Sequence, residues 1–296
     1  MTYTVTDLIA ERKFVEAPRW HQGRFWFSDL YEFAVLSARE DGSDLRVEVE
    51  VLEQPSGLAW LPDGRLLVVS MRDRKLLRRE HDGTVVVHAD LGEHTRGFCN
   101  EVIVDAAGRA YVGSFGFDLD NDAPMAPAAI HRVDPDGTVT EVAGDMWFPN
   151  GWVLTDDNVL IVNETFGNRV SAFDLTEDGR LVNRRVWAQF GPLPALGRPI
   201  GDCVAEFVVQ PDGMCIDADG ALWIADLGAR KLLRVVEGGE VVDEIEPGGM
   251  MPFAGALGGA DGHPLFICAA PDFKDVDRRS TRLAKIMTAR VPVGRA

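Results

Sequence analysis

The sequence lacks the features of several common protein classes. It has four cysteines among 296 residues, and Cys99, Cys203, Cys215 and Cys268 lie far apart with no CxxC pair. This spacing argues against a zinc knuckle or a disulfide framework, so we expect reduced and mostly buried thiols. No apolar run approaches the roughly 20 residues that span a bilayer, and the chain does not begin with a basic segment followed by a hydrophobic one. We therefore expect a cytoplasmic protein with no membrane partner.

Positive charge is also scarce in this chain. There are 30 Lys and Arg residues against 47 Asp and Glu residues, which gives a net charge of −17. Such an excess of negative charge disfavours nonspecific binding to phosphate backbones and to anionic membranes. We therefore expect no nucleic-acid partner.

The common catalytic motifs are missing as well. There is no GxSxG elbow, since VGSFG places Ser114 one position off, and there is no HExxH, no GxGxxG after a strand and no P-loop. The histidines are scattered and mostly adjoin turns, and His94 is the one nearest in sequence to Asn100. Serine-hydrolase, zincin and nucleotide-binding chemistry are therefore disfavoured.

A repeated unit is present in the turns. A small polar turn with Gly or Asn precedes a short run of β-branched or aromatic residues. The copies are GRFWFSD from Gly23, GRLLVVS from Gly64, GRAYVGS from Gly108, NVLIVNE from Asn158, GALWIAD from Gly220 and HPLFICA from His263. Their starts are 41 to 62 residues apart, close to the ~40–50 residues of a four-stranded propeller blade.

The runs between the copies complete the pattern. IHRVDPDGTVTEVAG and KLLRVVEGGEVVDEIE, for example, are typical of hairpins with DG or GG at the tip. Long amphipathic helical periodicity is almost absent, which argues against a βαβ architecture. We predict an all-β chain in which residues 1–296 form a single six-bladed β-propeller domain, with four-stranded blades around a central metal-binding channel. Because an open ring leaves two free edges, the segment around Thr2 to Arg12 should pair with the strand around Leu283 to Val291.

One position of each repeat carries a polar side chain in most copies. The stretches that precede the turns begin with Glu16, Ser56, Asn100, Asn150, Asp212 and Phe253, the last assigned to within one residue. The innermost strand of each blade lines the channel of a propeller, so equivalent residues at its start form a ring. Asn and Asp beside Gly are also common in turns and caps. Oxygen-bearing side chains at one structural position in four blades nevertheless favour a functional site.

Such a ring has the chemistry of a cation site. Carboxylates crowded into a narrow channel repel one another and lose hydration, so they require a cation or protons. The donors are two carboxylates and two amides, a set of oxygens that suits a hard cation such as Ca²⁺ better than Zn²⁺. We expect one divalent metal ion, with Ca²⁺ favoured and Mg²⁺, Mn²⁺ or Zn²⁺ as alternatives.

Four motifs together resemble a known family. EAPRW with GRFWFSD, CNEVIVDAAGRAYVGS, PNG and PDGMCIDADGALWIAD are similar to the SMP-30/gluconolactonase/LRE family of regucalcin-like lactonases, over about residues 11 to 271. The resemblance implies a six-bladed propeller that binds one divalent metal in its channel and hydrolyses lactones. It implies that Glu16, Asn150 and Asp212 are metal ligands. Asn100 matches the residue that either joins the metal or holds substrate beside it.

One position departs from the family pattern. Sugar-lactone members tend to carry Arg two residues before the position of Asn100, where it grips substrate hydroxyls, but this chain has Phe98 there. The neighbouring Arg96 is an alternative donor, although an aromatic wall is the simpler interpretation. We expect Phe98, Asn100 and Trp152, which flanks Asn150, to contact the substrate. A less polar or ring-bearing lactone or ester is favoured over a sugar lactone.

The resemblance implies lactone hydrolysis at the cation that the oxygen donors would hold. The metal polarises the carbonyl and stabilises the developing oxyanion, and water loses a proton as it attacks. Asp212 is favoured as the general base, with a metal-activated hydroxide or direct attack by Asp212 as alternatives. Other functions consistent with the scaffold are hydrolysis of organophosphates, another metal-dependent reaction, or calcium-binding regulation without turnover.

Two segments interrupt the repeat. Residues 115–130 carry alternating acidic residues but lack the Gly and the distal Glu of an EF-hand, so a solvated loop is expected. Residues 190–213 form a long loop that leads to Asp212 and is either a lid over the channel mouth or a surface excursion that supports an oligomer. In the lid alternative, the candidate substrate contacts are Arg198, Asp202 and Glu206.

Overall fold

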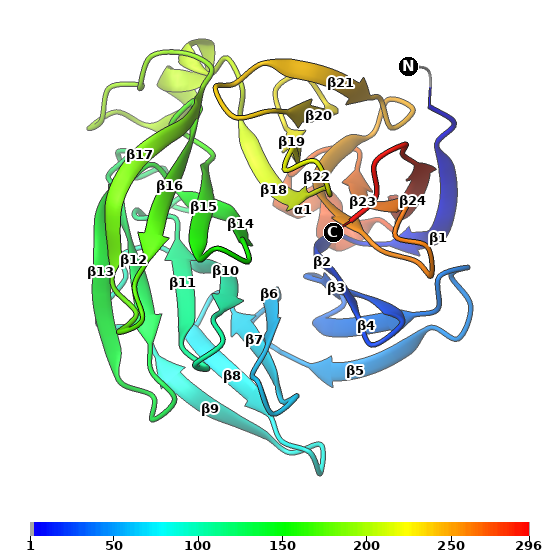
Figure 1. The fold of residues 1–296 in the computed structure, drawn as a ribbon, viewed down its shortest axis with the longest axis horizontal. Helices are drawn as coiled ribbons and strands as arrows, with labels where there is room; N and C mark the ends of the chain where they lie inside the picture. Colours follow the sequence, from blue (N-terminus) through cyan, green and yellow to red (C-terminus); the bar gives the residue numbers. More distant parts are fainter. Residues whose placement is uncertain (1–2, 296) are drawn as a thin grey trace. The chain divides into compact units, whose positions relative to one another are not determined.

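The computed structural model describes residues 3–295 of the chain, and nearly all of the regular structure is β-strand. The strands form six four-stranded sheets (Figure 1). Five sheets each take four consecutive strands, and the sixth combines the last three strands of the chain with the first. This is the strand arrangement of a six-bladed β-propeller with four-stranded blades, so the predicted fold class is confirmed.

The chain divides into two compact units with three blades each. Unit 1 comprises the described parts of Met1–Pro55 and Asp212–Ala296, and unit 2 is Ser56–Pro211. That residues 1–296 form a single domain stays a prediction.

Unit 1 contains the first, fifth and sixth blades. The first blade is β2 (Val15–His21), β3 (Arg24–Asp29), β4 (Ala34–Ala38) and β5 (Arg46–Glu50). The fifth blade is β18 (Pro211–Ile216), β19 (Leu222–Asp226), β20 (Lys231–Val235) and β21 (Val241–Ile245). The sixth blade is β22 (Met251–Leu257), β23 (Pro264–Ala270), β24 (Ala284–Arg290) and β1 (Thr6–Arg12), with the short helix α1 (Asp275–Ser280) before β24. Within this unit β22 packs against both β2 and β19.

Unit 2 contains the second, third and fourth blades. The second blade is β6 (Pro55–Trp60), β7 (Leu66–Ser70), β8 (Lys75–Arg79) and β9 (Val85–Asp90). The third blade is β10 (Cys99–Val104), β11 (Ala110–Ser114), β12 (Ala128–Val133) and β13 (Val139–Met146). The fourth blade is β14 (Pro149–Leu154), β15 (Val159–Glu164), β16 (Arg169–Leu175) and β17 (Leu181–Gln189), followed by the 3-10 helix η1 (Ile200–Glu206). Here β10 packs against β7 and β14.

The N-terminal strand closes the sixth blade. β1 pairs antiparallel with β24, with Thr6 opposite Thr288 and Arg12 opposite Ala284, and the two strands run side by side in Figure 1. The predicted pairing is therefore confirmed for β1 and β24. Thr2, where that prediction began, lies outside the described residues.

The repeated turn-and-strand unit is the second strand of every blade, namely β3, β7, β11, β15, β19 and β23. The turn before this strand requires a left-handed residue. Gly64 has a φ of 88° and Asn158 a φ of 61°, which Gly adopts without steric cost and Asn tolerates. This requirement explains why Asn158 can replace Gly at the start of the copy in the fourth blade.

Apolar side chains of neighbouring blades form the core. In unit 2, Leu67 and Val69 of the second blade lie in one buried cluster with Cys99, Val102 and Val112 of the third. All four cysteines are free thiols, as predicted, and burial raises the pKa of Cys99 to about 12. Cys99 is therefore a packing residue and not a nucleophile.

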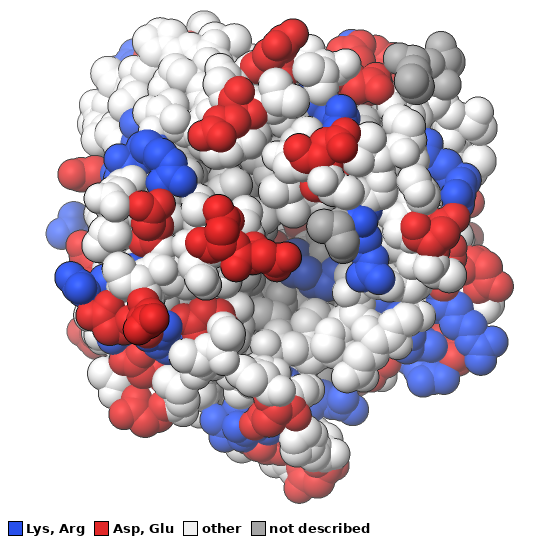
Figure 2. Space-filling view, viewed as in Figure 1, with Lys and Arg blue, Asp and Glu red and all other residues white. Residues whose placement is uncertain are grey.

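Acidic and basic side chains are mixed on the face of the molecule that Figure 2 shows. Figure 2 shows Asp and Glu side chains interspersed with Lys and Arg on the face in view, with no continuous basic area there. In the described part of the chain, no helix has both the length and the apolar character needed to cross a membrane.

Candidate functional site

The aligned polar residues occupy the same place in their blades. Glu16, Ser56, Asn100, Asn150 and Asp212 are each the second residue of the first strand of a blade. In the sixth blade the first strand begins one residue earlier, at Met251, and Pro252 pairs with Ala269 as Pro149 pairs with Glu164. Phe253 is therefore the residue of the sixth blade that aligns with Asn150, as the alignment of the repeats predicted.

In unit 2, a series of hydrogen bonds links Ser56, Asn100 and Asn150. Ser56 Oγ donates to Asn100 Oδ1 over 2.9 Å, and Asn100 Nδ2 donates to Asn150 Oδ1 over 2.8 Å. Asn150 Nδ2 then donates to Thr165 Oγ1 over 3.1 Å, and Thr165 Oγ1 donates to the carbonyl of Pro211 over 2.9 Å. The side chains of all four residues are buried, so the series runs through the interior.

The direction of this series fixes both amides. Thr165 gives its single proton to a backbone carbonyl, so its oxygen must accept from the NH₂ group of Asn150. The carbonyl oxygen of Asn150 then faces the NH₂ group of Asn100, whose own oxygen faces the Ser56 hydroxyl. Ser56 and Thr165 therefore act as positioning residues for the two asparagines. Sequence reasoning placed Ser56 at the right position without assigning it a role, and it missed Thr165, whose only signal was its place directly after NVLIVNE.

A buried carboxylate holds the turn that leads to Asn150. Glu164 is fully buried, and its oxygens accept from Arg169 Nε over 2.7 Å and from the backbone N–H of Trp147 over 2.8 Å. Ser171 and Arg184 also donate to it. A buried carboxylate needs such a complete set of partners. The result is a fixed backbone three residues before Asn150.

Unit 1 contributes the two carboxylates of the predicted set. Glu16 Oε2 accepts a 2.7 Å hydrogen bond from the backbone N–H of Ala17, a buried residue with a φ of 51°. Asp212 is only 5% exposed. After it, a Cβ atom at Gly213 would lie 2.3 Å from the Cβ of Ala254, so glycine is required where the fifth blade meets the sixth. The Glu16 carboxylate thus accepts from the adjacent backbone N–H, and Asp212 precedes a glycine that packs tightly against Ala254.

Phe98 begins a series of aromatic contacts in unit 2. Its ring meets Phe115 edge-on at 6.3 Å, Phe115 stacks on Phe148 at 3.9 Å, and Phe148 lies 5.2 Å from Phe166. The guanidinium of Arg72 lies over the Phe98 ring at 5.0 Å. Phe98 is thus half-buried in an aromatic wall, at the start of the strand that carries Asn100.

Trp152 lies deeper than the other predicted substrate contacts. It is 6% exposed and packs in a buried cluster with Tyr111, Leu160 and Val162, where the third and fourth blades meet. Its burial favours a packing role, and a contact of Trp152 with substrate stays a prediction.

The two loops that interrupt the repeat pack on each other in unit 2. The backbone N–H of Met125 donates to the carbonyl of Arg198, and that of Gly197 donates to the carbonyl of Met125. Met125 and Cys203 are buried with Phe117, Phe148 and Phe166 in one apolar cluster. The loops therefore cover the end of unit 2 at which the strands of Asn100 and Asn150 begin, and Arg198 pairs with Glu206 over 2.5 Å within the longer loop.

Asn168 anchors the longer loop to the fourth blade. Its Oδ1 accepts from the backbone N–H groups of Val208 and Val209, and its Nδ2 donates to the carbonyls of Pro192 and Glu206. Because both ends of the loop are hydrogen-bonded to this one buried amide, residues 190–210 are held as an ordered segment. That these residues act as a lid stays a prediction.

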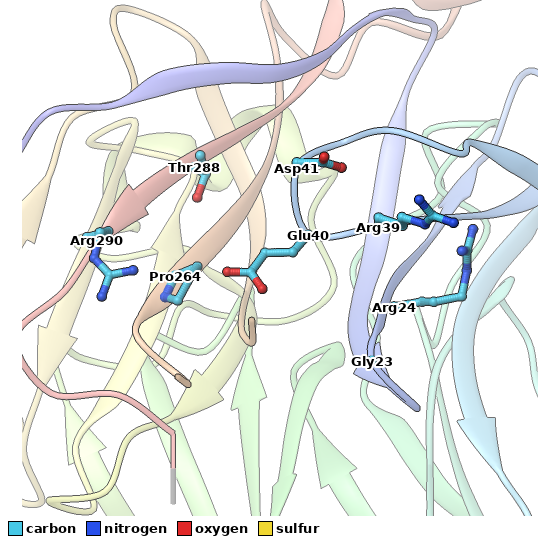
Figure 3. A pocket seen from close by; sticks show the side chains of 8 residues that line it. All are labelled: Gly23, Arg24, Arg39, Glu40, Asp41, Pro264, Thr288 and Arg290. Carbon is cyan, nitrogen blue, oxygen red and sulfur yellow. The ribbon is translucent and has the colours of Figure 1, made fainter. Parts of the chain in front are cut away.

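A large pocket lies elsewhere. It has a volume of about 750 Å³ and is lined in unit 1 by residues of the first and sixth blades. Figure 3 shows Glu40 reaching toward Pro264, with Arg24 and Arg39 on one side and Arg290 on the other. Glu40 accepts from the backbone N–H of Ala260, and Arg24 and Arg290 pair with Asp44 and Asp261. None of the predicted site residues lines this groove.

The predicted donors fit a hard cation. Within residues 3–295 no group of three or more His, Cys, Asp or Glu side chains could hold a metal, and the predicted set contains only two carboxylates beside its amides. An amide oxygen has two lone pairs, so a hydrogen bond to Asn100 Oδ1 or Asn150 Oδ1 is compatible with coordination. The ligand set therefore suits an oxygen-preferring divalent ion.

The fold matches solved structures along nearly the whole chain. A luciferin-regenerating enzyme superimposes with a TM-score of 0.80 at 16% identity and covers 99% of this chain and 97% of its own. A gluconolactonase from Xanthomonas campestris superimposes with a TM-score of 0.72 at 23% identity over 98% of this chain and 90% of its own. These similarities establish the propeller class.

The sequence then defines the family. Residues 14–271 match the family described as the SMP-30/Gluconolactonase/LRE-like region, and the chain belongs to this family. The pentonolactonase XacC of Haloferax volcanii is 30% identical over 219 residues, 71% of this chain and 65% of its own length. The 6-deoxy-6-sulfogluconolactonase of Pseudomonas putida is 27% identical over 269 residues, 88% of this chain and 85% of its own. A regucalcin of Danio rerio is 28% identical over 155 residues, 51% of this chain and only 47% of its own length.

Proposed function

We propose that this protein is a lactonase, a carboxylic ester hydrolase that opens a lactone ring with the help of a bound divalent metal. The observation that carries the proposal is the repeated position of Glu16, Asn100, Asn150 and Asp212, each second in the first strand of its blade, in a chain of this family. The names of two of its relatives, a pentonolactonase and a sulfogluconolactonase, support a lactone as the substrate.

The metal would be held by Glu16, Asn150 and Asp212, with Asn100 as a further ligand or as a substrate contact. A divalent ion, with Ca²⁺ favoured for these oxygen donors, supplies Lewis-acid polarisation of the carbonyl when bound. The roles of the chain's own groups follow from their fixed directions. Asn100 and Asn150 are locked by Ser56 and Thr165, so they present oxygen without reorganising.

The reaction consumes one water molecule. Water adds to the lactone carbonyl and gives one proton to a base, the ring C–O bond breaks, and the ring oxygen leaves as a hydroxyl after it gains a proton. We assign the base to Asp212. A carboxylate that also binds a cation is a weaker base. A substitution at Asp212 therefore tests whether this carboxylate accepts the proton of the attacking water.

Replacement of Asp212 by Asn separates its roles. We expect Asp212→Asn to reduce kcat by roughly a hundredfold or more, as loss of a general base does, while metal remains bound. Asp219→Asn is the matched control, because Asp219 lies in the turn after the same strand and is 65% exposed. Near-normal turnover by a metal-loaded Asp212→Asn variant would remove Asp212 both as the base and as a direct nucleophile.

A further inference from the structure

Unit 2 has a pocket of about 310 Å³ beside Phe98. Three arginines line it, Arg72 and Arg74 from the turn after β7 and Arg96 from the segment before β10. The other lining residues are Gly97, Asp118, Asp120 and Asn121. Its volume lies at the lower end of the range for small-molecule sites.

Both carboxylates of this pocket already have partners. Asp120 Oδ2 pairs with Arg72 Nη1 over 2.8 Å. Asp118 Oδ2 accepts from Asn121 Nδ2 over 2.7 Å. Both acidic side chains are therefore already hydrogen-bonded within the protein, and the three arginines outnumber the two carboxylates in the lining.

Arg74 and Arg96 retain unused donors. Arg74 donates through Nη1 to the carbonyl of Thr95 over 2.9 Å, and Arg72 divides its guanidinium between Asp120 and the face of Phe98. Arg96 is exposed, and within the described residues 3–295 it makes no hydrogen bond or ion pair. A guanidinium has five N–H donors, so Arg96 offers the pocket a positive charge and hydrogen-bond donors for a ligand.

Gly97 fixes Arg96 and Phe98 relative to each other. A Cβ atom at Gly97 would lie 2.5 Å from the carbonyl oxygen of Phe117 and 2.9 Å from the Cβ of Phe115. Only glycine allows this close approach of two backbone segments. The segment that carries Arg96 and Phe98 is therefore held against the loop after β11 and does not depend on its own exposed side chains for its position.

We infer that this pocket binds a carboxylate carried by the substrate, with Arg96 as the main donor, Arg72 as the second, and Phe98 along the lactone ring. Guanidinium groups pair with carboxylates through two parallel hydrogen bonds, which gives both affinity and orientation. Phe98 precedes Asn100 by two residues, so their Cα atoms are at most about 7 Å apart. A carboxylate arm on a lactone ring held at Asn100 can therefore reach the pocket. This inference rests on the proposed function and names its substrate class.

The inference also explains the departure from the family pattern at position 98. The positive charge expected there is absent, and it stands instead at Arg96 and Arg72, which line the same pocket as the Phe98 ring. An arginine at position 98 would suit the hydroxyls of a sugar, whereas an aromatic ring in a pocket with guanidinium groups suits an apolar ring that bears one anionic group.

The test compares two butyrolactones that carry either a carboxylate or the isosteric, neutral carboxamide at the same ring carbon. The wild-type protein should hydrolyse the carboxylate compound with the higher kcat/KM. Arg96→Gln should raise KM for the carboxylate compound by about tenfold to a hundredfold, the loss expected for a charged hydrogen bond, with values for the carboxamide within about twofold. Arg180→Gln is the control for net charge, because Arg180 lies in unit 2, is 65% exposed and pairs only with an exposed Asp178, and it should change neither substrate.

Two kinds of result would overturn the inference. One is a wild-type protein that turns over the carboxamide as well as or better than the carboxylate, and the other is an Arg96→Gln variant that affects both compounds equally. Should the wild-type protein hydrolyse neither lactone, the proposed function fails, and the pocket is then judged by calorimetric binding of the carboxylate-bearing butyrolactone. Binding that weakens in Arg96→Gln but not in Arg180→Gln supports the assignment of the pocket as a carboxylate-binding site. Absence of binding to the wild-type protein contradicts that assignment.

Discussion

The side-chain amide of Asn100 donates to that of Asn150 over 2.8 Å in the interior of unit 2. The two residues hold the same position in neighbouring blades, 50 residues apart in sequence. Their contact is one step in a series that begins at Ser56 and ends at the carbonyl of Pro211. A reversal of either amide would bring two donors or two acceptors together, so each orientation depends on the next.

Thr165→Val tests this dependence. Valine has a similar shape but neither accepts from Asn150 nor donates to Pro211, and two buried polar groups then lose their partner. The free energy of unfolding should fall by about 1–3 kcal/mol, and lactonase activity should fall because Asn150 is free to turn. The measurements are urea denaturation and kcat/KM.

Thr165→Ser is the matched control for that variant, since it keeps the hydroxyl. It should stay near the wild-type protein in activity and lose less stability than valine. Equal behaviour of the serine and valine variants would show that the hydroxyl has no positioning role.

Phe98 should set the preference for apolar lactones. The wild-type protein is expected to hydrolyse aliphatic or aromatic lactones faster than gluconolactone, because an aromatic wall gives sugar hydroxyls no partner. Phe98→Ala should lower that ratio of kcat/KM values by roughly tenfold, and Phe273→Ala, which removes a 65% exposed ring, should leave it unchanged. A wild-type protein that prefers gluconolactone would contradict the assignment of Phe98.

Acidification should destabilise the protein through its buried histidines. Burial lowers the pKa of His131 from its usual 6.5, with the neighbouring His94 lowering it further and Glu141 opposing the shift. The unfolded chain therefore binds a proton at a higher pH than the folded chain does. The contribution of the neutral His131 to the free energy of unfolding is fully present above pH 6.5 and is lost as the pH drops below that value.

His131→Gln should flatten that decline, and urea midpoints measured across the range between neutral and mildly acidic pH will show it. The exposed His81→Gln is the control and should follow the wild-type curve. A His131→Gln variant with the same pH dependence as the wild-type protein would mean that other groups cause the decline.

The blades could be predicted because each depends on short-range signals. The turn before β15 needs a left-handed residue, and Asn158 supplies it as Gly does elsewhere. The alignment of Glu16 with Asp212 followed from the same turns. Phe253 of the sixth blade could be assigned only to within one residue from the sequence because the turn of that blade is longer, and the pairing of Pro252 with Ala269 aligns it with the other blades.

The partners of the site residues could not be predicted in the same way. Thr165 contacts Asn150 because the pairing of two strands aligns them. Glu164 accepts from Arg169 and Arg184, and these side-chain contacts do not produce a periodic pattern in the sequence. The close approach at Gly97, which positions Arg96, likewise depends on a loop from another part of the third blade.

The central claim is that lactone hydrolysis by this chain requires a divalent metal, and activity before and after chelation tests it most directly. Protein treated with EDTA and shown by elemental analysis to be metal-free should lose its turnover of lactones, and added Ca²⁺ or Mn²⁺ should restore it. A protein that only binds calcium would show a shift in melting temperature with no turnover at any stage. Full lactonase activity from the metal-free protein would contradict the account.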